Sequence, residues 1–298
     1  MTYRLSFTEE PAELLSTASE FLAAEPVVST VMSTFTERLA RERAEGKPAP
    51  AHPCWWVTVH EGDQVVGVAM RTAPFEPHPM FVLPMPDDAA RAIADAIAAR
   101  DEEVRGVNGA LPAAEVLATT LAAHYGGTAD IHEHTRLHVL GELVAPPSPP
   151  GRLRAATSAD AALSLAWFQG FLAEAAEQAG RPHPPLSDFH DEEFIAGKIA
   201  RQEIWLWEAE DGEVVHLTAH NPPSYGVARI GPVFTPRSHR GRGYASAGVA
   251  AVSRRLRDQG ADVCLYTDQA NPTSNKVYAA IGFEPLVDQG NWVVRVTD

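Results

Sequence analysis

The second half of the chain shows a regular succession of strand-like and helix-like patterns. Short apolar or alternating runs predict strands at 152–157, 203–210, 213–220, 226–235, 261–267, 283–287 and 291–296. Apolar residues spaced three and four apart predict helices at 158–175, 188–202, 244–259 and 272–281. This half therefore reads as one α/β domain without a long irregular insert.

The first half of the chain has a weaker pattern in a similar order. Helical spacing predicts helices at 12–23, 28–45, 87–100 and 113–124. Two apolar runs joined by an acidic turn predict a β-hairpin at 55–74, and a closing strand is predicted at 137–144.

The two halves also share a sequence pattern. Residues 55–74 and 204–223 align without a gap, so that Trp56 matches Trp205 and both segments end in proline. Because the register is constant across two strands and their turn, we interpret the match as a tandem duplication.

A proline-rich segment separates the two halves. Residues 146–151 contain four prolines, which can continue neither a helix nor a central strand. We therefore predict two domains, 1–145 and 152–298, joined by this linker. A length of 298 residues suits two domains better than one.

Composition and charge narrow the class of protein. The chain is 45% hydrophobic, has no apolar run long enough to span a membrane, and lacks a signal-peptide pattern at its start. We expect a cytoplasmic globular protein without a membrane partner. A net charge of -15 argues against a nucleic-acid partner. Cys54 and Cys264 are expected to be buried thiols, and because they lack metal-ligand spacing no metal is expected.

A cationic segment interrupts this acidic chain. Residues 229–257 contain seven arginines and no acid, and within them the sequence RGRGYA, residues 240–245, joins a predicted strand to a predicted helix. Glycine lets the backbone approach a ligand closely, and a helix N-terminus offers N–H groups and a positive dipole end. The segment is thus predicted to bind a pyrophosphate.

Two familiar phosphate-binding loops and a plain turn fit these residues less well. A Walker loop would need Gly-x-x-x-x-Gly-Lys-Ser/Thr, which the chain lacks. The dinucleotide fingerprint is nearly matched at Gly241, Gly243 and Ser246, but it should open the first βα unit of a parallel sheet, whereas a β-hairpin precedes it here. A tight structural turn accounts for one glycine and leaves the flanking arginines without a role.

The loop and a second segment resemble the signature of the GNAT superfamily of acyl-CoA N-acyltransferases. The first match is Arg240-x-x-Gly243-x-Ala245 after a strand ending in Val-Phe-Thr-Pro. The second is residues 266–283, similar to the family's strand–Asn–helix–Tyr–Gly-Phe segment. The resemblance covers the second half, while the first half fits only as a diverged copy. The tandem layout is similar to two-domain bacterial members of the mycothiol-synthase type.

The resemblance implies a fold and a set of contacts to acetyl-CoA as co-substrate. The fold would be α/β (α+β), with two tandem GNAT-like domains, each a mixed, mostly antiparallel sheet flanked by helices. Pantetheine would lie in a V-shaped opening between the strands at 226–235 and 261–267. The implied cofactor-binding residues are Val233, Phe234, Thr235, Arg240, Gly241, Arg242, Gly243, Tyr244, Ala245, Ser246, Asn271 and Asn275. For Asn271, a helix cap is the alternative.

The resemblance also implies the catalytic roles. Tyr278 matches the position of the general acid that protonates the leaving thiolate, and packing beside Phe283 is its structural alternative. Attack by the amine would be direct, with the oxyanion bound by a backbone N–H near Phe234. The sequence offers four candidates for the general base and does not decide between them: Glu203, Glu208, His216 and His220.

The sequence is compatible with two kinds of function. The first is an N-acetyltransferase for an amine acceptor, a small molecule rather than a protein, and the acidic surface favours a cationic one. The alternative is an acyl-CoA-binding sensor or scaffold without turnover. The acyl chain length and the choice between monomer and homodimer stay open. Residues 107–114, taken as the first half's counterpart of the loop, lack the signature, so this half is expected not to bind CoA productively.

Overall fold

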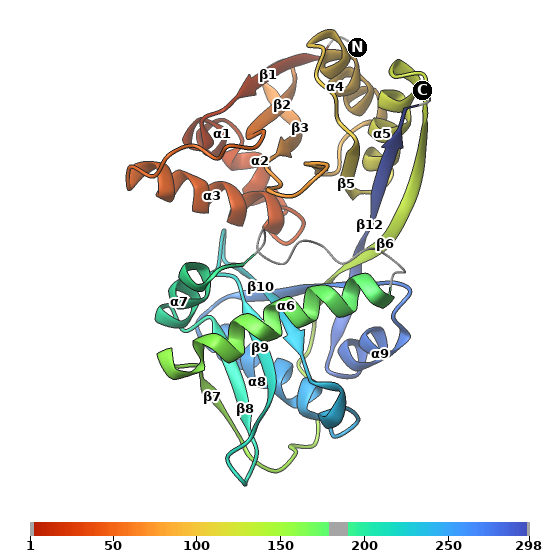
Figure 1. Cartoon of the computed structure of the whole chain (residues 1–298). Helices are drawn as coiled ribbons and strands as arrows, with labels where there is room; N and C mark the ends of the chain where they lie inside the picture. Colours follow the sequence, from red (N-terminus) through yellow and green to blue (C-terminus); the bar gives the residue numbers. More distant parts are fainter. Residues whose placement is uncertain (1–2, 179–189, 297–298) are drawn as a thin grey trace. The chain divides into compact units, whose positions relative to one another are not determined.

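A computed structural model describes residues 3–178 and 190–296 (Figure 1). These residues form two compact units. The first unit contains the chain up to Leu137, residues 268–270, and the chain from Leu286 onward. The second unit contains His138–Thr267 and Asn271–Pro285. Each unit thus combines residues from both sides of the proline-rich segment.

The first unit is a mixed sheet with helices on both faces. Its strands are β1 (Arg4–Thr8), β2 (Trp55–Glu61), β3 (Gln64–Arg71), β4 (Met80–Val82), β5 (Gly106–Ala110) and the later part of β12 (Phe283–Arg295), in that order. Its helices are α1 (Pro11–Thr17), α2 (Ser19–Ala24), α3 (Thr30–Ala44), α4 (Asp87–Ala99) and α5 (Ala113–His124). The strands β4 and β5 are parallel, and the other pairs resolved in this sheet are antiparallel.

The second unit repeats this plan. Its strands follow the order β6-β11-β10-β9-β8-β7, where only the end of β6 (Thr128–Leu140), from His138 onward, belongs to this unit. The other bounds are β7 (Arg152–Ala155), β8 (Ile204–Glu208), β9 (Val214–His220), β10 (Val227–Phe234) and β11 (Asp262–Asp268). Its helices are α6 (Ala161–Gln178), α7 (Glu192–Ala200), α8 (Tyr244–Asp258) and α9 (Pro272–Ala280). Here β10 and β11 are the parallel pair. The predicted α/β fold is therefore confirmed.

Alternating side chains divide the second sheet between two layers of helices. Ile204 and Leu206 of β8 pack with Phe168 of α6 and Ile195 of α7, whereas Trp205 packs in the cluster that contains Val252. The helices α6 and α7 thus cover one face and α8 covers the other. Figure 1 shows α6 crossing the strands β9 and β10.

The elements around the predicted loop agree closely with the sequence pattern. The strands β10 and β11 and the helices α8 and α9 begin and end within a residue or two of their predicted bounds. One prediction was wrong: the two closing strands are a single strand, β12, because Gln289 and Gly290 already pair with β5. The predicted start of the helix at 188–202 falls partly outside the described residues. Its described part begins at Glu192, where the Asp191 side chain caps Phe194 N.

The first half differs more from its prediction. The strands β1, β4 and β5 were not predicted, and β6 begins at Thr128 rather than at 137. The helix predicted at 12–23 is two short helices. The counterpart of the loop was also misplaced. The chain order strand–loop–α8–β11–α9 corresponds to β4–loop–α4–β5–α5, so the counterpart is residues 83–86, and residues 107–114 correspond to the junction after β11.

Candidate active site

The two parallel strands of the second unit separate before they end. Pairing between β10 and β11 runs from Val227 and Asp262 to Ile230 and Leu265 and stops there. Beyond this point β10 continues to Phe234 after a register shift between Ile230 and Val233, and among the described residues it pairs there with β9 alone. The edge of β10 that faces β11 is therefore open along its last residues, as the resemblance implied. Backbone N–H and C=O groups at such an edge can bind an extended amide-containing ligand.

The loop after β10 ends in two glycines in the left-handed region. Gly241 has a φ of 75°, and Gly243, with a φ of 84°, is the N-cap of α8. A Cβ atom at either position would meet no atom within 4 Å, so the conformation rather than crowding requires glycine. The amides of Tyr244, Ala245 and Ser246 belong to the first turn of α8, which has no intrahelical acceptors for them. Free amides at a helix start of this kind can bind an anion.

The three arginines of the loop are held in place by specific partners. Arg240 donates from Nε to the carbonyl oxygen of Thr235 at 2.9 Å, and Arg242 donates to the carbonyl oxygen of Ser238 at 3.2 Å. Arg240 also forms an ion pair with Glu174 of α6. Arg237 pairs with Glu174 at 3.4 Å and with Glu177 at 2.6 Å. The sequence prediction did not include these two acids, although their i, i+3 spacing on one helix face was a visible signal.

The end of β10 also contacts α6 through aromatic packing. The rings of Phe234 and Trp167 lie 5.8 Å apart, and a Cβ atom at Gly170 would come within 3.2 Å of the Phe234 ring. This packing holds the open strand end beneath α6. It also gives the opening an apolar wall on the α6 side.

Tyr278 lies in α9 and is half-buried against the apolar cluster that includes residues of β10 and β11. Its ring makes an edge-to-face contact with Phe283 at 6.0 Å, and burial raises its pKa to about 12. The phenol therefore keeps its proton at neutral pH. Asn271 is the N-cap of α9, because its side chain accepts a hydrogen bond from Ser274 N at 3.1 Å. Asn275 lies one turn further along, half-buried, and its N–H bonds to the Asn271 carbonyl oxygen.

His216 is a structural residue rather than an exposed base. It is fully buried, and its Nδ1 and Nε2 lie 2.8 Å and 2.7 Å from the hydroxyls of Thr235 and Thr218. Burial lowers its pKa to about 3, so the ring is neutral. A Cβ atom at Gly248 would collide with this ring, which shows how tightly α8 packs against β9.

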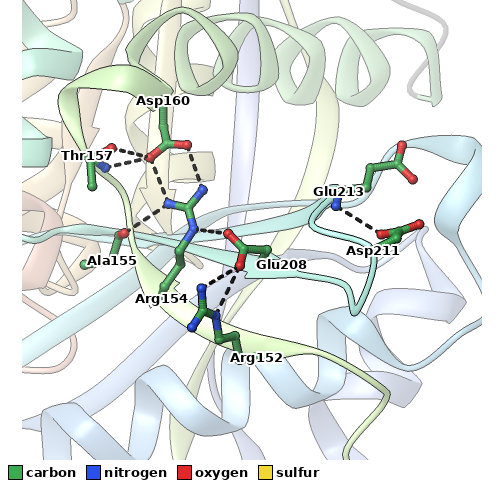
Figure 2. Close-up of polar contacts among 8 residues, drawn as sticks. All are labelled: Arg152, Arg154, Ala155, Thr157, Asp160, Glu208, Asp211 and Glu213. Carbon is green, nitrogen blue, oxygen red and sulfur yellow. Dashed lines mark hydrogen bonds and ion pairs between the residues drawn. The ribbon is translucent and has the colours of Figure 1, made fainter.

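The two carboxylate candidates for the base are both ion-paired. Glu203 is buried and pairs with Lys198 at 3.0 Å and with Arg201 at 2.6 Å. Glu208 accepts from Arg152 and Arg154 (Figure 2). These arginines hold the pKa of Glu208 below its usual range.

Figure 2 shows that Arg154 lies between two acids. It bridges Glu208 to Asp160, and Asp160 also accepts from the backbone N–H and the hydroxyl of Thr157. The contact with Arg154 keeps the pKa of Asp160 well below its usual range. This network fixes the start of α6 to β7 and β8.

The fourth candidate, His220, lies at the end of β9. Its Nδ1 is 3.0 Å from the Asn221 carbonyl oxygen, and burial lowers its pKa. It shares a sheet face with His216, the face covered by α8. The structure thus brings together the strand edge, the loop and the start of α8, and it places none of the four base candidates on the open edge of β10.

The comparisons with known proteins agree with this geometry. Residues 209–293 match the family model described as FR47-like protein. A GCN5-related N-acetyltransferase from Sphaerobacter thermophilus is 17% identical, with a TM-score of 0.60, over 97% of this chain and 94% of its own. A GNAT-family acetyltransferase from Colwellia psychrerythraea is 14% identical, with a TM-score of 0.55, over 98% of this chain and its own full length.

A third solved structure has a tandem arrangement. A tandem GNAT protein from the clavulanic acid biosynthesis pathway is 15% identical, with a TM-score of 0.53, over 99% of this chain and all of its own. No curated protein matches the sequence significantly. The chain therefore has the fold of tandem GNAT proteins, and the resemblance predicted from the sequence is confirmed at the level of the fold.

Residues 3–178 and 190–296 also lack two features that would change this picture. No helix in these ranges is both long and apolar enough to cross a membrane. Within the same ranges, no three His, Cys, Asp or Glu side chains are grouped to hold a metal ion.

Proposed function

We propose that the second half of the chain, residues 152–298, is an acetyl-CoA-dependent N-acetyltransferase. It would transfer the acetyl group directly to an amine of a small molecule rather than of a protein. The observation that supports this most is the separation of β10 from β11 after Ile230, directly before a glycine-rich loop and the start of α8. A strand edge for an amide-rich arm and a helix start for a pyrophosphate fit the two halves of CoA.

In this proposal each part of the site has one task. The edge at Val233, Phe234 and Thr235 binds the pantetheine arm, and a backbone N–H near Phe234 stabilises the oxyanion. The amides of residues 241–246 bind the pyrophosphate, with Arg240 and Arg242 at its rim. Asn271 and Asn275 act near the arm or the adenosine portion, where the capping bond of Asn271 to Ser274 limits its side chain to a positioning role.

Tyr278 is proposed to donate the proton that the leaving CoA thiolate needs. Because burial raises its pKa to about 12, the phenol is protonated whenever a thiolate forms near neutral pH. The amine would lose its proton to water or to a base other than the four candidates, since Glu203 and Glu208 are ion-paired and both histidines lie on the α8 face.

The second candidate function, an acyl-CoA-binding sensor or scaffold without turnover, is favoured by the absence of these four candidates from the open edge of β10. The two functions differ in one measurement: release of free CoA from acetyl-CoA with a panel of small amines, polyamines and aminoglycosides. Release with at least one amine, together with mass-spectrometric detection of its N-acetyl product, supports the enzyme. Tight CoA binding without release on any amine supports the sensor.

We also propose that the first half, residues 1–145, is a diverged copy that does not bind CoA, joined by residues 146–151 to the CoA-binding half, 152–298. The segment at the loop position, Leu83-Pro84-Met85-Pro86, has no glycine and no arginine, and its prolines lack N–H groups. This half would complete and stabilise the protein rather than take part in the transfer.

A further inference from the structure

The strand pair β10 and β11 has different side chains on its two faces. On one face, Ile230 of β10 and Leu265 of β11 pack with α8 in a single apolar cluster, and Tyr278 packs against that cluster. Successive side chains of a strand point to opposite faces. Arg229, before Ile230, and Tyr266, after Leu265, therefore point to the other face, which α6 and α7 cover. The proposed acid Tyr278 and the phenol of Tyr266 thus lie on opposite faces of the strand pair.

Tyr266 lies where the two strands separate. Leu265 is the last residue of β11 that pairs with β10, and Tyr266 follows it directly. Tyr266 is partly exposed, whereas its neighbours Leu265 and Thr267 are buried. At the open end of β10, the ring of Phe234 lies on the same face, against Trp167 of α6. The phenol is therefore placed beside the opening rather than sealed in the core.

Arg229 puts a positive charge near this phenol. It pairs across the strands with Cys264, which lies two residues before Tyr266 on the same face of β11. Burial lowers the pKa of Arg229, and the negative forms of Tyr266 and Cys264 act against that shift. Because electrostatic interaction is mutual, the guanidinium in turn favours a phenolate at Tyr266.

Two other charged groups lie near Arg229 and Tyr266. Lys198 of α7 pairs with Glu203 at 3.0 Å, and its pKa is lowered by burial and, to a smaller extent, by Arg229. Asp268, two residues after Tyr266, opposes a phenolate, but its Oδ1 accepts from a backbone N–H in the turn after β11 at 2.8 Å. A change at Arg229 alone would separate its effect from those of these groups.

We propose that Tyr266 accepts the proton that the acceptor amine loses, and that Arg229 is its positioning residue. This role rests on the proposed acetyl transfer. As the nitrogen–carbon bond forms, the nitrogen gives a proton to the Tyr266 phenolate. As the carbon–sulfur bond breaks, the sulfur takes a proton from Tyr278. One tyrosine ends protonated and the other deprotonated, and exchange with solvent restores both.

The placement on opposite faces suits this pair of transfers. Nitrogen and sulfur are different substituents of the acyl carbon in the tetrahedral intermediate, so the proton acceptor and the proton donor must reach it from different sides. Two groups of one kind can take opposite roles when their surroundings differ. Burial raises the pKa of Tyr278 to about 12, which keeps it protonated, whereas Tyr266 has a guanidinium nearby.

The kinetic test compares matched variants over a range of pH, with an amine that the wild type acetylates. Tyr266→Phe should lower kcat by about 100-fold while acetyl-CoA binding by calorimetry stays unchanged. In the wild type kcat should rise with pH and level off, whereas in Tyr266→Phe it should rise without levelling. Tyr278→Phe should retain the levelling. Arg229→Gln should move the rise to higher pH, and Arg229→Lys should move it less. The ionisation of the amine itself is common to all variants.

A second measurement does not depend on turnover: the ultraviolet absorbance of phenolate, titrated over pH in the whole protein. The difference between the wild type and Tyr266→Phe isolates Tyr266. We expect this difference to appear at a lower pH than the same difference measured in Arg229→Gln. Tyr3→Phe, in the first unit, is the control, and its titration should not change with Arg229→Gln.

Three results would overturn the role of Tyr266. The first is the same Tyr266 titration with and without Arg229. The second is wild-type turnover and pH profile in Tyr266→Phe, which would leave the acetyl transfer in place and remove this residue from it. The third is absence of turnover on every amine, which would overturn the acetyl transfer and this role together.

Discussion

The two units contain the same central pair of parallel strands, but only the second pair opens. β4 pairs with β5 at all three of its residues, and a Cβ atom at Gly109 would overlap the Val82 carbonyl oxygen. β10 pairs with β11 over four residues and then continues to Phe234 without it. Closed pairing satisfies the backbone internally, whereas the open pair leaves N–H and C=O groups for a ligand.

The segments that follow β4 and β10 also differ in whether their backbone N–H groups are free to bind a ligand. After β4, Leu83 N bonds to the Val68 carbonyl oxygen, and the side chain of Met85 packs beside Gly67. Pro84 and Pro86 have no N–H to offer an anion. After β10, glycines and arginines lead into the amides of α8. One architecture thus gives a packed unit or a candidate binding unit, depending on a few residues after one strand.

The largest expected effect is on catalysis in the open unit. We predict that Tyr278→Phe lowers kcat by at least about 100-fold, because it removes the proton donor, while the KM for acetyl-CoA changes little. Since the pKa of Tyr278 is raised to about 12, the wild-type kcat should not fall between pH 8 and pH 10 through loss of this proton. Steady-state kinetics on an amine found by the screen would check both. An unchanged kcat in the variant would remove Tyr278 from the mechanism.

The close pairing of β4 with β5 is expected to contribute to the stability of the first unit, and the open pair of the second unit has no equivalent contact. Gly109→Ala puts a methyl group against Val82 and should destabilise the chain by about 1–3 kcal/mol, without changing CoA affinity. Gly231→Ala in β10 is the matched variant, since its φ of 151° resembles the 141° of Gly109 but a Cβ atom would meet nothing within 4 Å. Urea unfolding should show the larger loss for Gly109→Ala. Equal losses would mean that backbone strain rather than close pairing explains the glycine.

A pH effect is expected from the histidine beneath the open strand. His216 is neutral in the folded chain, with a pKa near 3, and has a pKa near 6.5 when unfolded. Between these values the unfolded chain binds the additional proton, so stability falls as pH falls below 6.5. The slope from this group is about 1.4 kcal/mol per pH unit. From pH 7 to pH 5, His216→Asn should therefore lose roughly 2 kcal/mol less than the wild type in urea unfolding. Identical losses would contradict the buried neutral ring.

The smallest effect is expected at the acids that hold the loop arginines. Glu174→Gln removes a carboxylate that pairs with Arg237 and Arg240 and so competes with the ligand for these arginines. Because exposed ion pairs contribute about 0.2–1 kcal/mol, the variant should bind acetyl-CoA a few-fold more tightly at low salt. Calorimetric titration at two salt concentrations would measure it. Glu192→Gln on α7 is a control that removes an exposed acid from another helix. Weaker binding in Glu174→Gln would show that the acid positions the arginines instead of competing with the ligand.

The sequence was most informative where local rules determine structure. The turn at Gly241 and Gly243, the start of α8 and the Asn271 cap follow from residues adjacent in the chain, and each was predicted or left as a named alternative. Long-range features were missed, because pairing between Glu174 and the loop, or the passage of β6 and β12 through both units, depends on tertiary contacts. β4 was missed because three residues between prolines give too little pattern.

The central claim is that only the open strand pair binds CoA, and calorimetric titration of acetyl-CoA tests it most directly. We predict one site per chain in the wild type, loss of binding in Gly243→Glu, and wild-type binding in Gly212→Glu, a turn glycine with a φ of 85° and equally open surroundings. Absence of binding to the wild type, two sites per chain, or full binding by Gly243→Glu would contradict the account.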